Sequence, residues 1–227
     1  MRRSNIYILL LLVALLLPGC AKTASQPHVH TWENRKCVTC GEEKEIHRLG
    51  NWEYVLWEEE ETMEIISFPE TDEKVFFRDL PEKISKVRIG DGITAIPDYA
   101  FAGCENLVDV VIPKTARTIG KCAFAQCINL ARINIPEGVT SIGDYAFLMC
   151  SSLNRLTIPD SVTALGDWAF RGCTALTRLA IPDSVTSIGY DTFGSCPDLT
   201  LTVGCGSYAA QYAEENSIPY AFANAGS

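Results

Sequence analysis

The sequence predicts an α+β solenoid, a column of stacked units of 23 residues each. The pair Ile-Pro recurs at 112–113, 135–136, 158–159 and 181–182, always 23 residues apart. Three further rows keep the same step over five units, and they run from Phe101 to Phe193, from Cys104 to Cys196 and from Leu107 to Leu199. Because one unit cannot bury its apolar residues alone, the units must stack on one another.

Composition and charge narrow the class of protein. The chain has 227 residues, of which 47% are hydrophobic, so its composition is that of a globular chain and not of a disordered one. It carries 28 acidic and 19 basic side chains, which gives a formal net charge of −9. This charge disfavours nucleic acid and anionic lipid as partners that are attracted by bulk charge.

Residues 1–19 are predicted to be a signal peptide. Two arginines near the start precede an almost unbroken apolar run from Ile6 to Leu17. The run is too short for a comfortable membrane span. A signal peptide implies a location outside the cytoplasm.

The end of this run, Leu-Leu-Pro-Gly-Cys20, resembles a bacterial lipoprotein box, which implies acylation of Cys20 and an anchor in a membrane. Pro18 is unusual at its place in that box. An ordinary secretory signal with a chance cysteine is the alternative. Residues 20–27 are small and polar, as a lipidated tether should be.

Residues 28–47 form a predicted Cys/His knuckle. They hold all three histidines of the chain and a Cys-x-x-Cys-Gly turn, whose spacing suits tetrahedral zinc. The candidate metal ligands are His28, His30, Cys37, Cys40 and His47. The segment also resembles short H-x-W…C-x-x-C-G knuckles of bacterial surface proteins. In an exported protein Cys37 and Cys40 can instead form a structural or redox-active disulfide, or the cluster can lack a defined role.

Residues 48–88 are predicted to cover the N-terminal end of the solenoid. Two β-prone runs, Trp52–Glu58 and Thr62–Phe68, flank an acidic turn and suit a β-hairpin. The first stacked strand is expected at Ile84–Ile89. A cap is expected because an exposed end of a stacked core would aggregate.

Residues 89–204 are predicted to hold five units, each with two extended segments. Leu176–Ile181 is typical of a short strand, and Val162–Leu165 of a second extended segment. Between these segments Gly166-Asp167 is expected to turn the chain and to cap a short helical turn that bears Phe170.

Residues 205–227 are predicted to cover the other end. Ser207–Asn216 has helical composition, and Tyr208, Ala209 and Tyr212 lie at helical spacing. A helical cap is therefore expected there.

The pattern of the units resembles a known family. The motif I-P-x-x-V-T-x-I-G-x-x-A-F-x-x-C-x-x-L-x-x-L is similar to the BspA-type, or Treponema-type, leucine-rich repeat of bacterial surface proteins, from Ile89 to Val203. The last strand, Leu201-x-Val203, is one residue out of phase, which indicates that the solenoid ends there. The resemblance implies a leucine-rich repeat fold, and adhesion to or interaction with host proteins, matrix proteins or other cells.

The five cysteines of one row are expected to be core residues. Small, weakly polar side chains pack well inward. Coils that repeat at about 4.8 Å hold these side chains parallel, which suits contact better than disulfide geometry. The row is therefore predicted to consist of buried free thiols. Cys122 and Cys205 lie off the row, and the sequence leaves open whether they pair.

The sequence offers little support for catalysis. No histidine follows His47, so a serine or cysteine nucleophile in the solenoid would lack its usual base. No glycine-rich phosphate loop and no paired metal-binding carboxylates stand out. The chain is therefore expected not to be an enzyme.

Polar residues between the strand leucines form a candidate binding face, because these positions lie on the concave side of leucine-rich repeats. The candidate partner-binding residues are Lys86, Arg88, Arg132, Asn134, Arg155, Thr157 and Arg178. Neighbouring arginines about 5 Å apart in water repel by roughly 0.8 kcal/mol, so the stripe can receive carboxylates, sulfates or phosphates. Duplication of an arginine that extends harmlessly into water is the alternative.

Together these features predict a lipid-anchored surface protein that binds a protein or glycan non-covalently through the concave sheet of its solenoid. One alternative is a metal-binding or thiol-redox lipoprotein that works through Cys37 and Cys40. Another is a structural spacer in the cell envelope. Zinc is the only cofactor that the sequence indicates.

Overall fold

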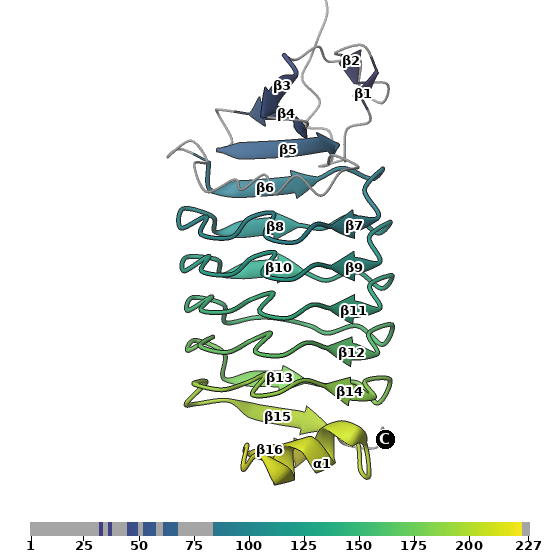
Figure 1. The fold of residues 1–227 in the computed structure, drawn as a ribbon, viewed down its shortest axis with the longest axis vertical. Helices are drawn as coiled ribbons and strands as arrows, with labels where there is room; N and C mark the ends of the chain where they lie inside the picture. Colours follow the sequence, from purple (N-terminus) through teal and green to yellow (C-terminus); the bar gives the residue numbers. More distant parts are fainter. Residues whose placement is uncertain are drawn as a thin grey trace, which may run out of the picture.

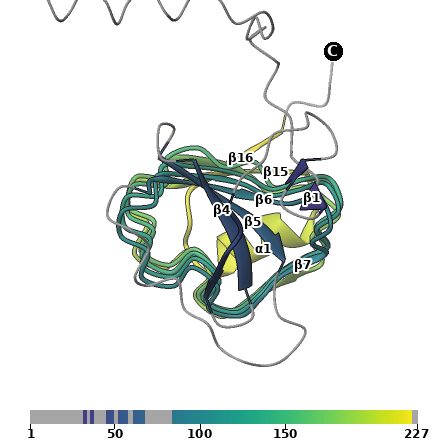
Figure 2. The same ribbon diagram turned by 90° about the horizontal axis from the view of Figure 1, so that it is seen from above.

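The computed structural model describes residues 32–33, 36–37, 45–49, 52–57, 61–67 and 84–223. From residue 84 onward the chain winds into a stack of similar coils (Figure 1). Seen along the stack, the coils superpose in one rounded outline (Figure 2). The solenoid predicted from the repeated rows is therefore confirmed.

One side of the stack, the long-strand face, carries the longer strands. They are β6 (Lys86–Ile89), β8 (Asp109–Val111), β10 (Arg132–Asn134), β13 (Arg178–Ala180) and β15 (Thr200–Val203). Neighbouring strands pair in parallel, except between β10 and β13, where Arg155 forms only an isolated bridge to Arg132. The face is therefore divided between two sheets.

A second side, the short-strand face, carries strands of two residues. They are β7 (Ala95–Ile96), β9 (Thr118–Ile119), β11 (Ser141–Ile142), β12 (Ala164–Leu165) and β14 (Ser187–Ile188). All five pair in parallel without interruption. In each strand the first residue is small or polar and lies outward, and the second is a buried Ile or Leu, as the period of a strand requires.

A column of phenylalanines fills the core between the faces. Phe101, Phe124, Phe147 and Phe170 are fully buried, and successive rings stack with centroids 5.3–5.4 Å apart. Phe193 continues the column at 5.7 Å from Phe170. Equivalent apolar residues therefore lie one above the other, as the three sequence rows predict.

The predicted helical turn around Phe170 is wrong, because the coils contain strands and turns and the one described helix lies after them. Ala169 N–H donates to the Gly166 carbonyl over 3.3 Å, which closes a tight turn and no α-helical one. The residue before it, Trp168, has a left-handed φ of 58°, and its equivalents Tyr99 and Tyr145 have the same conformation. A left-handed residue in every coil stops a helix from growing. The chain forms a β-solenoid with one α-helix in the described residues.

The phase shift predicted near the end of the repeats is confirmed. Leu179 in β13 faces Leu201 in β15, a step of 22 residues instead of 23. The shift keeps Leu201 fully buried. A step of 23 would bring Thr202 to that position.

Antiparallel strands precede the coils. β4 (Trp52–Trp57) pairs with β3 (His47–Leu49) and with β5 (Thr62–Ser67), and β5 pairs in parallel with β6. The hairpin of β4 and β5 therefore continues the long-strand face. A separate antiparallel pair joins β1 (Trp32–Glu33) and β2 (Lys36–Cys37).

The helix α1 (Tyr208–Glu215) lies across the other end of the stack (Figures 1 and 2). The Ser207 side chain accepts a hydrogen bond from Ala210 N–H and caps the helix. The chain then adds β16 (Tyr220–Phe222), which pairs in parallel with β15 and was not predicted. Of the described helices none has the length and apolar character needed to cross a bilayer.

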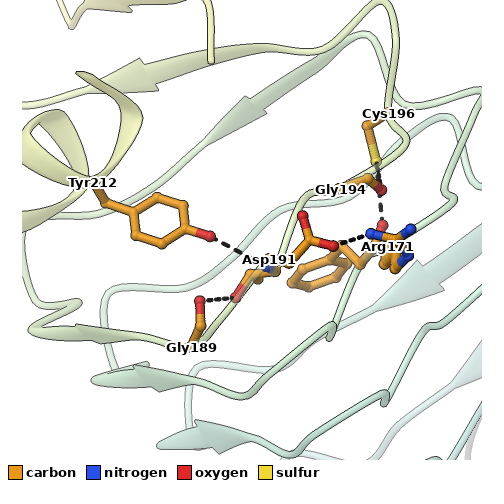
Figure 3. A network of polar contacts seen from close by, with 8 residues as sticks. Arg171, Gly189, Asp191, Gly194, Cys196 and Tyr212 are labelled. Atoms are coloured by element: carbon orange, nitrogen blue, oxygen red, sulfur yellow. Dashed lines mark hydrogen bonds and ion pairs between the residues drawn. The ribbon is translucent and has the colours of Figure 1, made fainter. Parts of the chain in front are cut away.

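Polar contacts join α1 to the last coil (Figure 3). The Tyr212 hydroxyl accepts a hydrogen bond from Thr192 N–H over 3.1 Å, and the Thr192 hydroxyl donates to the Gly189 carbonyl over 2.9 Å. Arg171 pairs with Asp191. The bonds of Thr192 satisfy its buried polar groups where the stack of coils ends, and the Arg171–Asp191 pair is half-buried.

Candidate binding surface

A groove of about 800 Å³ lies on the long-strand face. It spans four coils, from Asp109 in β8 to Arg178 in β13. Of the seven predicted binding residues, five line it: Arg132, Asn134, Arg155, Thr157 and Arg178. The structure therefore brings most of the predicted residues into one groove.

Arg132 is the only one of the three groove arginines that has an acidic partner in the described part of the chain. Its guanidinium lies 3.1 Å from the Asp109 carboxylate, which faces it in the register of β8 and β10. The Arg132 side chain is 66% exposed, so solvent screens the pair and its contribution to stability is small. The Asp109 carboxylate nonetheless weakens the attraction that Arg132 would offer an anionic ligand.

Arg155 and Arg178 are exposed. No described carboxylate lies within ion-pair distance of either guanidinium. The C-terminal part of the groove is therefore the more positive part.

The Asn134 side chain is exposed, but its amide already makes two hydrogen bonds within the protein. Its amide accepts a hydrogen bond from Ile112 N–H over 3.0 Å and donates one to the Ile112 carbonyl over 3.2 Å. This pair of bonds joins β10 to the coil before it. Asn134 would have to give up these bonds to bind a partner through its amide.

Lys86 and Arg88 do not line the groove. Both lie on β6, where the register places Lys86 opposite Thr62 and Arg88 opposite the buried Glu64. Opposite charges directly across neighbouring strands stabilise a sheet, so the position of Arg88 suits the hairpin. The two residues stay predicted contacts outside the groove.

Seven of the twelve residues that line the groove were missing from the predicted set. Asp109 and Val111 occupy the same two rows as the chosen residues, and the rows alone would have identified them. Leu156 occupies the same row as the buried Val110, Ile133 and Leu179, but it is only half-buried and lines the groove. No feature of the sequence separates Leu156 from its buried equivalents.

The predicted metal and lipid sites lie mostly outside the described residues. Cys20, His28, His30 and Cys40 lie outside the described ranges. Cys37 belongs to β2, and the His47 ring stacks on Tyr54 with centroids 5.4 Å apart. Within the described ranges no group of three or more His, Cys, Asp or Glu side chains is placed to hold a metal. The zinc and disulfide hypotheses stay predictions.

The cysteine row consists of free thiols, as predicted, and its first four members are buried. The Cys127 thiol donates to the Phe101 carbonyl over 3.0 Å, and Cys150 and Cys173 make the same bond one and two coils later. Burial raises the pKa of Cys127 to about 12. Cys122 and Cys205 are also free, the first half-buried and the second exposed. The buried row is therefore a poor source of thiolate nucleophiles.

Comparison with protein families gives a match over residues 72–200. The matching family is described as the BspA type leucine rich repeat region, and six copies are found. The sequence predicted five, because its count began at residue 89. No curated protein matches the chain.

Solved structures of bacterial leucine-rich repeat proteins are similar to this chain. The leucine-rich repeat protein of T. pallidum is 27% identical, with a TM-score of 0.53, over 70% of this chain and 71% of that one. A leucine-rich repeat protein of Bacteroides ovatus is 24% identical with a TM-score of 0.44, over 70% of this chain and 55% of that one. A leucine rich cell surface protein of Faecalibacterium prausnitzii is 29% identical with a TM-score of 0.45, over 71% and 55%.

Proposed function

The chain belongs to the BspA-type leucine-rich repeat family, and from this premise we propose that it is a cell-surface lipoprotein that binds a protein or glycan. Binding is non-covalent and uses the long-strand face. The role is adhesion to, or interaction with, host proteins, matrix proteins or other cells.

The groove on the long-strand face is the observation that supports this proposal. Its exposed rows combine cationic side chains with Val111, which is 41% exposed, and the half-buried Leu156. Apolar surface beside charged groups suits a protein or glycan partner, because the first supplies area to bury and the second supplies orientation. The short-strand face offers mainly small, uncharged side chains in its strands.

Residues at both ends of the chain are assigned supporting roles. The hairpin of β4 and β5 caps the N-terminal end of the core, and α1 caps the C-terminal end. Cys20 bears the lipid that holds the protein at the membrane, and residues 20–27 tether the solenoid to it. Residues 205–227 complete the cap.

Binding to arrays of surface proteins and glycans tests the role of the groove. The full chain in mild detergent is compared with Thr157→Trp, which fills the groove, and with Ser187→Trp on the short-strand face. We expect Thr157→Trp to abolish binding of the captured ligand and Ser187→Trp to leave it unchanged. A ligand that binds both variants equally well would overturn the proposal, as would the absence of any ligand.

Mass spectrometry of the protein from membranes tests the anchor. We expect an N-terminal peptide that begins with a lipid-modified Cys20. An unmodified Cys20 would leave an ordinary secretory signal as the correct interpretation.

A further inference from the structure

The long-strand face loses its regular pairing in one coil, at residues 154–157. These residues form no strand, whereas β10 before them and β13 after them do. Leu156 is half-buried in this coil, although its equivalents Val110, Ile133 and Leu179 are buried. The coil therefore sits less tightly on the core than its neighbours, and the groove lies over it.

The same coil is regular on the other face. Ala164 in β12 pairs with Ser141 on one side and with Ser187 on the other, as in every other coil. The stacked phenylalanines also continue through it, with 5.3 Å between the Phe147 and Phe170 rings. The irregularity therefore belongs to the long-strand face and not to the coil as a whole.

The like charges of this face coincide with the place where the pairing fails. Asp109 and Arg132 lie directly across from each other in β8 and β10, and opposite charges stabilise such a pair. The next residue in the row, Arg155, forms a parallel backbone β-bridge with Arg132, and Arg178 follows one repeat later. Arg155 therefore lies between two like charges, which weakens the pairing of its strand.

We propose that this coil binds an extended acidic peptide of a partner protein, with its carboxylates held between Arg155 and Arg178. Guanidinium and carboxylate form paired, charge-assisted hydrogen bonds, and a carboxylate between the two arginines would remove their repulsion. The residues of an extended peptide that point to one side recur about every 7 Å, so alternate acidic residues can all face the groove.

This inference rests on the proposed function, because it names the class of partner that the same groove takes. A peptide fits better than a sulfated glycan because the exposed Val111 and the half-buried Leu156 give the groove apolar surface that peptide side chains can cover. The Thr157 hydroxyl and the half-buried Leu156 lie in the same groove and can contact the side chains between the acidic residues.

The test is the affinity of the full chain, in mild detergent at low salt, for a fluorescent peptide of alternating Glu and Ser. Fluorescence anisotropy gives the dissociation constant. We expect Arg155→Gln with Arg178→Gln to weaken binding at least about tenfold, as removal of one side of a charge pair does. The matched control, Lys114→Gln with Lys121→Gln, removes two exposed positive charges outside the groove and should change the affinity less than about twofold.

Three results would overturn the inference. They are no binding of the peptide to the native chain, equal affinity of the native chain and the groove variant, and preferential binding of a sulfated oligosaccharide. The Thr157→Trp variant distinguishes failure of the acidic-peptide inference from failure of the proposed binding function. If it blocks a ligand that the arginine variant still binds, the groove is the binding site and the acidic peptide is the wrong partner.

Discussion

The two faces of the solenoid are built by the same coils, yet one is continuous and the other is interrupted. On the short-strand face the outward residues are Ala, Ser and Thr, and five strands pair in one sheet. On the long-strand face the outward row passes from Asp109 through three arginines, and the sheet divides at the middle arginine, Arg155.

The contrast arises because stacking places the same side chain at the same position in every coil. A row of identical apolar residues gains contacts from each new coil, as the phenylalanine column does. A row of identical charges gains a repulsion from each new coil. A long row of one charge is therefore costly unless a ligand of the opposite charge is available, and for this reason the interrupted face is the candidate for recognition.

The largest effect is expected in the core that both faces share. Phe147→Ala should lower the free energy of unfolding by about 3–5 kcal/mol, because it empties a fully buried position between two stacked rings. Urea denaturation measures the loss. Tyr190→Ala, at a residue that is 74% exposed, is the control and should cost less than about 0.5 kcal/mol. A loss below about 1 kcal/mol for Phe147→Ala would contradict the stacked core.

The next effect concerns the tight contact between coils beside the short-strand face. A methyl group on Gly166 would lie 2.4 Å from the Asp144 nitrogen and 2.5 Å from the Gly143 carbonyl carbon. Gly166→Ala should therefore cost about 1–3 kcal/mol of stability in thermal unfolding, since backbone must move.

Gly92→Ala is the matched control for this prediction, because nothing lies within 4 Å of the added methyl group. It should leave the melting temperature nearly unchanged. Equal melting temperatures for the two variants would show that the coils are more loosely stacked than the structure indicates.

A smaller effect is expected from the buried thiols at high pH. The pKa of Cys127 is raised by burial from 9.0 to about 12, so the unfolded chain loses this proton at a lower pH than the folded chain does. Below about pH 9 the thiol is protonated in both states and does not change the free energy of unfolding. As the pH rises from there towards 12, the free energy of unfolding falls. Between about pH 8 and pH 10 this thiol should cost roughly 1 kcal/mol.

Cys127→Ala isolates that contribution. The difference in unfolding free energy between the native chain and the variant should shift in favour of the variant as the pH rises, by about 1 kcal/mol over the same range. Parallel pH profiles for the two proteins would contradict burial of the thiol.

The smallest effect is expected on the long-strand face itself. Arg155→Thr removes the middle charge of the arginine row, so stability should rise by about 0.2–1 kcal/mol and residues 154–157 should pair more fully. Hydrogen exchange of their amides measures the pairing, and slower exchange in the variant is the expected result. Asp109→Asn is the opposite control, because it leaves Arg132 without its carboxylate and should lower stability slightly.

Periodic features of the fold were accessible to prediction. The rows that contain Phe147 and Cys150 have a fixed step, and a fixed step in a stack places equivalent residues one above another. The shift at Leu201 was visible for the same reason. Ser207 could be identified near the start of a helix because the helical signal is local.

Other features could not be predicted, because they depend on contacts between coils. Trp168 adopts a left-handed φ of 58° that its residue type disfavours, so the helical turn expected after it does not form. The Asn134 amide bonds to the backbone of Ile112, a neighbour only in the folded stack. Leu156 is half-buried although Leu179, a leucine in the same row, is buried, so residue type does not decide the difference.

The sequence alone thus determined the repeat period, the core rows and the place where the phase changes. The reason is that a solenoid converts sequence spacing directly into height along its axis. Which arginine meets a carboxylate and which meets another arginine was decided in three dimensions. That outcome depends on the register of strands about 23 residues apart and on the few ångströms that separate their side chains.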